Sequence, residues 1–105
     1  MLYVIGETDY NFIRIEYETM WDGGANLWNE VKRVEYGCFI ESATIINGHD
    51  RAKEVLEEIQ NRISEIRFSD ICLVGQIIAE RNGFDKVAYA KRLKIFELVP
   101  TPIED

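Results

Sequence analysis

The sequence has no long apolar segment, little proline and few glycines. No stretch of about 18 residues is both apolar and uncharged, so we expect no transmembrane helix. The 2 prolines, the 7 glycines and an apolar fraction of 47% argue against wholesale disorder and favour a globular chain. Residues 1–7 contain no lysine or arginine and already include Glu7, the opposite of a secretory signal peptide. We therefore expect a cytoplasmic protein without membrane association.

Histidine and cysteine are also scarce. His49 is the single histidine and cannot form a two-histidine metal site, while Cys38 and Cys72 belong to no CxxC motif. We expect no metal, no cofactor and two buried thiols that act as small hydrophobic groups. His49 precedes the predicted helix and fits a loop or cap residue. The alternative is a small enzyme with His49 as general acid or base, which needs a partner group within hydrogen-bond reach.

Positive charge is in deficit. The chain carries 12 lysines and arginines against 19 carboxylates, a net charge of −7, so direct binding to nucleic acid is not expected. Residues 1–50 hold nine carboxylates against three cations, whereas residues 51–105 hold ten against nine. Such a one-sided field speeds the encounter with a basic partner. The alternative is that the negative charge only keeps the protein soluble.

The length of 105 residues fits one domain, residues 1–105. Residues 12–21 alternate between apolar and polar side chains and predict a half-buried strand. The segment 22–26 contains two glycines and predicts a turn, followed by a second strand over residues 31–40. Short strands are also expected at residues 2–5 and 43–46.

Residues 49–67 predict one long amphipathic helix. Its apolar side chains recur at steps of three and four residues. Asn47 and Asp50 are both candidate N-caps, and Glu58 precedes Arg62 by four residues, the favourable order for an ion pair. The apolar face consists of Ala52, Val55, Leu56, Ile59, Ile63 and Ile66.

The C-terminal part predicts a closing hairpin. Residues 71–79 are rich in β-branched side chains and fit a strand, although Asp70 and Gly83 leave a helix open as the alternative. Asn82-Gly83 is a typical hairpin turn, and residues 87–99 alternate like a strand. The whole pattern predicts an α+β fold: a mainly antiparallel sheet of about five strands, with the helix packed on one face.

Trp21 and Trp28 flank the predicted turn of residues 22–26. Two interpretations are open: both rings fold back into the core, or they form an exposed anchor ringed by Asp22, Glu18 and Glu30. Glu16 and Glu18 share one strand face. A catalytic carboxylate pair needs an apolar pocket, so here we interpret them as solvated charges.

These features favour a small acidic inhibitor that binds a basic protein. The most concrete version is an immunity protein that neutralises a nuclease-type toxin, because a carboxylate-rich surface can cover a cationic cleft. A phage-type inhibitor of a host nucleic-acid-binding protein would use the same physics, and a homo-oligomeric module is a further alternative. The predicted partner-binding residues are Glu16, Glu18, Trp21, Asp22, Trp28 and Glu30.

Overall fold

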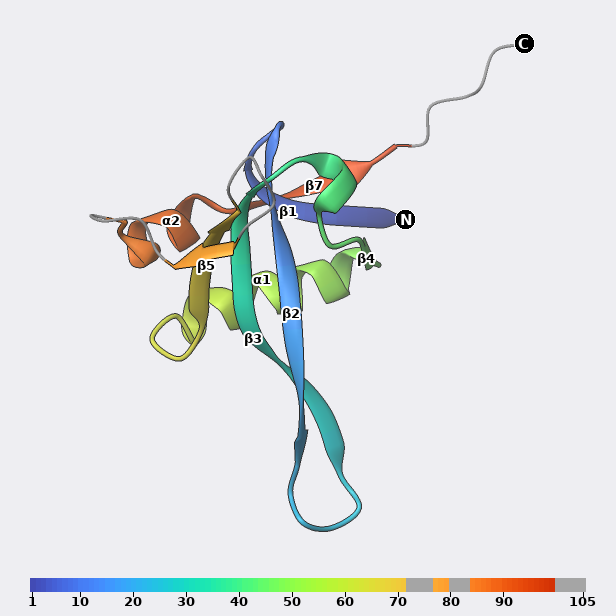
Figure 1. Ribbon diagram of the computed structural model, residues 1–105. Coiled ribbons are helices and arrows are strands. Elements are labelled where there is room, and N and C mark those ends of the chain that lie inside the picture. The colour runs from blue at the N-terminus through green and yellow to red at the C-terminus, as the bar shows by residue number, and fades with distance from the viewer. Residues whose placement is uncertain (72–76, 80–83, 100–105) are drawn as a thin grey trace.

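The computed structural model describes residues 1–71, 77–79 and 84–99, and the fold is α+β, as predicted (Figure 1). None of the helices in this part of the chain is long and apolar enough to cross a membrane. The strands are β1 (Leu2–Thr8), β2 (Asn11–Trp21), β3 (Leu27–Cys38), β4 (Ile46–Asn47), β5 (Arg67–Ile71), β6 (Ile77–Ala79) and β7 (Lys94–Leu98). The helices are α1 (His49–Asn61) and α2 (Lys86–Arg92), and a 3-10 turn η1 covers Ile40–Ser42.

The described strands form one mixed sheet, whereas the sequence predicted a mainly antiparallel one of about five strands. β7 pairs with β1 from Leu2 to Gly6, so β4 and β2 share the other edge of β1. β2 continues to β3, β5 and β6. The pair β3–β5 is parallel, because α1 carries the chain back to the same end of the sheet before β5 begins.

One face of the sheet packs against α1 and forms the main core. Ala52, Val55 and Ile59 of α1 are completely buried, as the apolar periodicity predicted. The helix ends at Asn61 rather than near residue 67, and Ile66 reaches the core from the connection to β5. The predicted N-caps are wrong: Gly48 occupies the N-cap position and no side chain caps it.

The predicted C-terminal hairpin is wrong. Asp85 caps α2 by accepting hydrogen bonds from the amides of Val87 (3.1 Å) and Ala88 (3.2 Å), so the first half of the predicted strand is a helix. The second half is β7, which pairs with β1 and not with β6. The predicted strand at residues 71–79 corresponds to the end of β5 and to β6, which pair with each other. Residues 72–76 and the predicted turn at residues 82–83 lie outside the described part.

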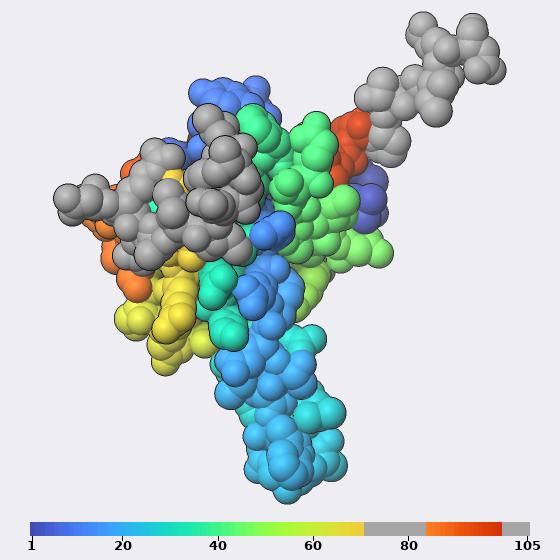
Figure 2. All heavy atoms as spheres, viewed as in Figure 1, coloured from blue at the N-terminus to red at the C-terminus, as the bar shows by residue number. Residues whose placement is uncertain are grey.

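The hairpin of β2 and β3 extends beyond the helix that packs against it. β3 has 12 residues and spans about 40 Å, whereas α1 crosses the two strands instead of running along them (Figure 1). The far part of the hairpin therefore extends away from the body as a two-stranded projection (Figures 1 and 2). We call residues 16–30, which end β2, form the turn and begin β3, the arm.

The end of α1 fastens the base of the arm. Glu58 Oε2 accepts a hydrogen bond from Val31 N (2.5 Å), and Arg62 Nη1 donates one to Val31 O (3.3 Å). Glu58 and Arg62 also pair with each other at 2.9 Å, as their spacing predicted. The two side chains thus satisfy the backbone N–H and C=O groups of Val31 on the edge of β3 that faces away from β2, where no neighbouring strand of the described structure does so.

A similar contact holds the opposite edge of the hairpin. Thr44, which follows η1, accepts a hydrogen bond from Ile15 N at its Oγ1 (2.6 Å) and donates its own amide to Ile13 O (3.2 Å). Residues 43–46 were predicted as a strand, but only Ile46–Asn47 has strand geometry. These contacts hold β2 at Ile13 and Ile15 and β3 at Val31, and the arm begins directly beyond them.

Replacing Glu58 with Ala should lower the free energy of unfolding by about 1 to 2 kcal/mol, because Val31 N loses its acceptor and Arg62 loses one of its carboxylate partners. Urea unfolding followed by circular dichroism measures this loss. Glu54→Ala is the matched control on the same helix, since the Glu54–Arg51 pair is exposed and should contribute less than about 0.5 kcal/mol. Equal losses in the two variants would contradict the fastening role of Glu58.

Candidate protein-binding arm

The strand register determines which side chains of the arm lie together. Glu18 lies opposite Glu30, and Thr19 lies opposite Asn29. Met20 lies opposite Trp28 and Trp21 opposite Leu27. In an antiparallel pair, opposite residues project from the same face and successive residues project from alternate faces. The two tryptophans therefore lie on opposite faces of the arm.

Trp21 and Leu27 lie on the face that continues into the core beside α1, because Tyr17, four residues before Trp21, packs against that core. We call this the inner face. Met20 and Trp28 lie on the outer face, together with Glu18 and Glu30. Of the predicted ring of carboxylates, Glu18 and Glu30 thus accompany Trp28 and not Trp21.

Both tryptophans are exposed, so the interpretation that they fold back into the core is wrong. Trp21 keeps 64% of its surface accessible, Leu27 69% and Trp28 43%. Each indole N–H already has an acceptor: Trp21 Nε1 donates to Gly24 O (2.8 Å), and Trp28 Nε1 donates to Glu30 Oε1 (3.0 Å). A partner can therefore cover either ring without supplying an acceptor at the N–H group.

Hydrogen bonds from Asp22 order the turn at the tip of the arm. Asp22 Oδ1 accepts from Gly24 N (2.7 Å), and Asp22 Oδ2 accepts from the Asn26 side-chain amide (2.9 Å). The bond from the Gly24 amide is the main reason why the pKa of the Asp22 carboxyl lies below its usual value. Gly23 has a φ of 86°, which glycine adopts without strain. The tip is thus ordered before any partner binds.

The four carboxylates of the arm differ in their partners. Residues 16–30 contain no lysine or arginine, so every cation comes from elsewhere. Glu16 lies 3.7 Å from Arg33, and Glu30 lies 3.3 Å from Arg62. Glu18 is exposed and has no hydrogen-bond or ion-pair partner in the described structure, although it lies opposite Glu30. Like charges in that position destabilise a hairpin, so folding alone does not explain the pair.

The sequence-based site omitted Met20 and Leu27, which lie opposite the two tryptophans. A signal was available, because pairing the residues symmetrically about the turn 22–26 places Trp21 opposite Leu27 and Met20 opposite Trp28. The sequence also gave no indication that Glu35 is buried. Its carboxylate, 3% exposed, lies in β3 opposite Arg14 and pairs with the Arg14 guanidinium.

The other candidate residues are not brought together. His49 is exposed at the first position of α1, and its ring contacts the edge of Tyr3 at 5.5 Å between centroids. Cys38 is buried, donates to Glu35 O (3.3 Å), and burial raises the pKa of its thiol to about 11. Cys72 lies outside the described residues. Catalysis by His49 remains a hypothesis for which these residues supply no partner group.

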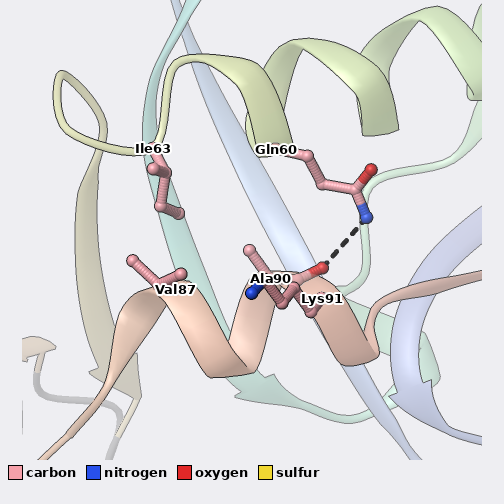
Figure 3. A pocket seen from close by; sticks show the side chains of 5 residues that line it. All are labelled: Gln60, Ile63, Val87, Ala90 and Lys91. Atoms are coloured by element: carbon pink, nitrogen blue, oxygen red, sulfur yellow. Dashed lines mark hydrogen bonds between the residues drawn. The ribbon is translucent and has the colours of Figure 1, made fainter.

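Within residues 1–71, 77–79 and 84–99, no three histidine, cysteine or acidic side chains are grouped so as to hold a metal ion. A pocket of about 240 Å³ lies between α1 and α2, where Gln60 Nε2 donates to Ala90 O at 3.1 Å (Figure 3). A second, of about 330 Å³, lies at the base of the inner face and is lined by Tyr17, Asn29 and Arg51, among others. Beyond this pocket at its base, the arm presents a projecting surface (Figure 2).

Comparison with protein-family models, curated proteins and solved structures gives no match.

Proposed function

We propose that the protein is a cytoplasmic inhibitor that uses the arm to bind a basic protein partner. The observation that carries the proposal is the pair of exposed, hydrogen-bonded tryptophans on an acidic hairpin that projects from the body. Tryptophan is the side chain most enriched among residues that dominate binding energy, and burying large apolar rings is the main favourable term in association. An ordered tip also lowers the entropic cost of binding.

The charge of the arm favours a cationic partner. The four carboxylates of the arm outnumber the two arginines that pair with them, Arg33 and Arg62, so the arm keeps a negative field. Such a field accelerates encounter with a positive surface and disfavours an acidic one. Nucleases need positive charge around their substrate phosphates, and an acidic projection can occupy such a surface. The most concrete form of the proposal is therefore an immunity protein against a nuclease-type toxin, with Glu16, Glu18, Trp21, Asp22, Trp28 and Glu30 at the interface.

The test begins with the protein immobilised on a column at low salt, loaded with extract from its native cell and eluted with a salt gradient. We expect a basic protein in the eluate. Its association rate should fall about threefold or more for Glu18→Gln, and further when Glu16, Asp22 and Glu30 are also neutralised. Stopped-flow fluorescence at several ionic strengths measures these rates.

Glu57→Gln is the matched control, because Glu57 is also exposed but lies on α1 and not in the arm. It removes the same charge and should change the association rate much less. An unchanged rate for the fourfold variant would contradict the proposed role of the acidic arm. A homo-oligomeric module, in contrast, would show a mass that rises with concentration in light scattering of the protein alone.

A further inference from the structure

The tip of the arm, residues 20–28, is apolar on both faces. Trp21 and Leu27 project from the inner face, and Met20 and Trp28 project from the outer face. The sheet is one layer thick at this point, and the contacts of Glu58, Arg62 and Thr44 all lie closer to the body. Neither face of the tip is therefore covered by the described part of the chain, which agrees with the exposure of both rings.

A hairpin that lies flat on a partner needs only one apolar face. The second face would stay in water, where a tryptophan adds no binding energy and promotes nonspecific association. From this we infer that the arm enters a cleft in its partner, so that the two walls of the cleft cover Trp21 and Trp28 separately. This inference rests on the proposed function and adds to it the shape of the surface that the partner presents.

The inner face of the arm is complementary to an apolar wall of the partner's cleft. Trp21 already satisfies its N–H group at Gly24 O, and Thr19 Oγ1 donates to Asn29 Oδ1 at 3.0 Å. Carboxylates are absent from the pairs Trp21–Leu27, Thr19–Asn29 and Tyr17–Val31 on this face. A wall of aliphatic or aromatic side chains can therefore cover Trp21 and Leu27 without leaving these polar groups unpaired.

The outer face of the arm is complementary to a cationic wall of the partner's cleft. Glu18 and Glu30 lie opposite each other, one residue pair away along this face from Trp28 and Met20. Glu30 already pairs with Arg62 at 3.3 Å, so Glu18 is the carboxylate that lacks a cation in the described part of the chain. A lysine or arginine of the partner placed at Glu18 would supply it and lie near the indole of Trp28, where a cation is also attracted to the ring. With about 10 Å between packed layers on either side, the backbones of the two walls would lie about 20 Å apart.

The chain contains 2 tryptophans, so single-tryptophan variants report on each face separately. Trp28→Phe leaves Trp21 as the probe of the inner face, and Trp21→Phe leaves Trp28 as the probe of the outer face. The partner is the basic protein recovered from the low-salt column, with its own tryptophans replaced by 4-fluorotryptophan, which is almost non-fluorescent. We expect the acrylamide quenching constant of both probes to fall about threefold or more on binding, because a cleft excludes water from both rings.

The outcomes separate this inference from the proposed function. Protection of one tryptophan alone would overturn the cleft and leave the acidic arm as a surface-binding element. Protection of neither, with binding intact, would show that the partner binds elsewhere and would overturn both. Protection of either probe in the free protein as its concentration rises would show self-association through the arm, which also overturns the cleft. A column that retains no basic protein at low salt would overturn both proposals.

Discussion

Replacing Arg14 with Gln should lower the free energy of unfolding by about 2 to 3 kcal/mol, although Arg14 lies on an exposed strand face. The loss comes from Glu35, the ion-pair partner of Arg14, and not from Arg14 itself. Glu35 is 3% exposed, and the Arg14 guanidinium is the one side-chain group that pairs with its carboxylate in the described structure. Without that guanidinium, a buried negative charge has no compensation. Urea unfolding at neutral pH measures the loss.

Two variants test whether the loss of stability comes from the unpaired Glu35 or would follow the removal of any arginine. Arg51→Gln breaks an ion pair in which both side chains are exposed, and it should change stability by less than about 0.5 kcal/mol. Adding Glu35→Gln to Arg14→Gln should recover much of the loss, because a neutral amide is less costly to bury than a carboxylate. Similar losses for Arg14→Gln and Arg51→Gln, or no recovery in the double variant, would contradict the argument.

The elements predicted best were those whose signal is local and repeated. The apolar face of α1 recurs over several turns, and the β2–turn–β3 unit combines alternation with two glycines in the turn. The prediction failed where a single residue decided between two local structures. In the segment after residue 84, the alternation fits a strand, but Asp85 accepts two amide hydrogen bonds and starts a helix instead.

Pairing between distant strands was also beyond the sequence pattern. β7 has the alternation of a strand, but nothing in its own residues indicates that β1, about 90 residues earlier, is its neighbour. The parallel pair β3–β5 follows from the path of α1 across the sheet, which depends on packing of the whole core. Strand existence could therefore be predicted, whereas strand order could not.

In the candidate site, too, the local pattern was predictable and the long-range packing was not. The sequence placed two tryptophans and four carboxylates around one turn, and the structure keeps them there. Whether the rings are buried depends on which part of the hairpin α1 crosses (Figure 1), and the packing of the whole core determines that. Because α1 crosses the hairpin near its base and contacts it at Val31, the tip of the hairpin has no cover, and the two faces of the arm become available to a partner.

Replacing either Trp21 or Trp28 with Ala should weaken binding to the basic partner by at least about 30-fold, the loss of about 2 kcal/mol that marks a dominant interface residue. The loss should appear mainly as faster dissociation, and it should persist at high salt, because it removes buried apolar area and not charge. Glu18→Gln should show the opposite pattern, a slower association whose effect fades as salt rises. Surface plasmon resonance at two salt concentrations separates the two kinds of effect.

Tyr10→Ala is the matched control for the tryptophan variants. Tyr10 is 72% exposed and lies in the turn between β1 and β2, at the end of β2 opposite the arm. Its removal should leave both rates unchanged. All three side chains lie on the surface and none belongs to the core, so none of the variants should lose more than about 1 kcal/mol of unfolding free energy. If Tyr10→Ala weakened binding as much as the tryptophan variants, the loss would not be specific to the arm, and the proposed arm interface would be contradicted.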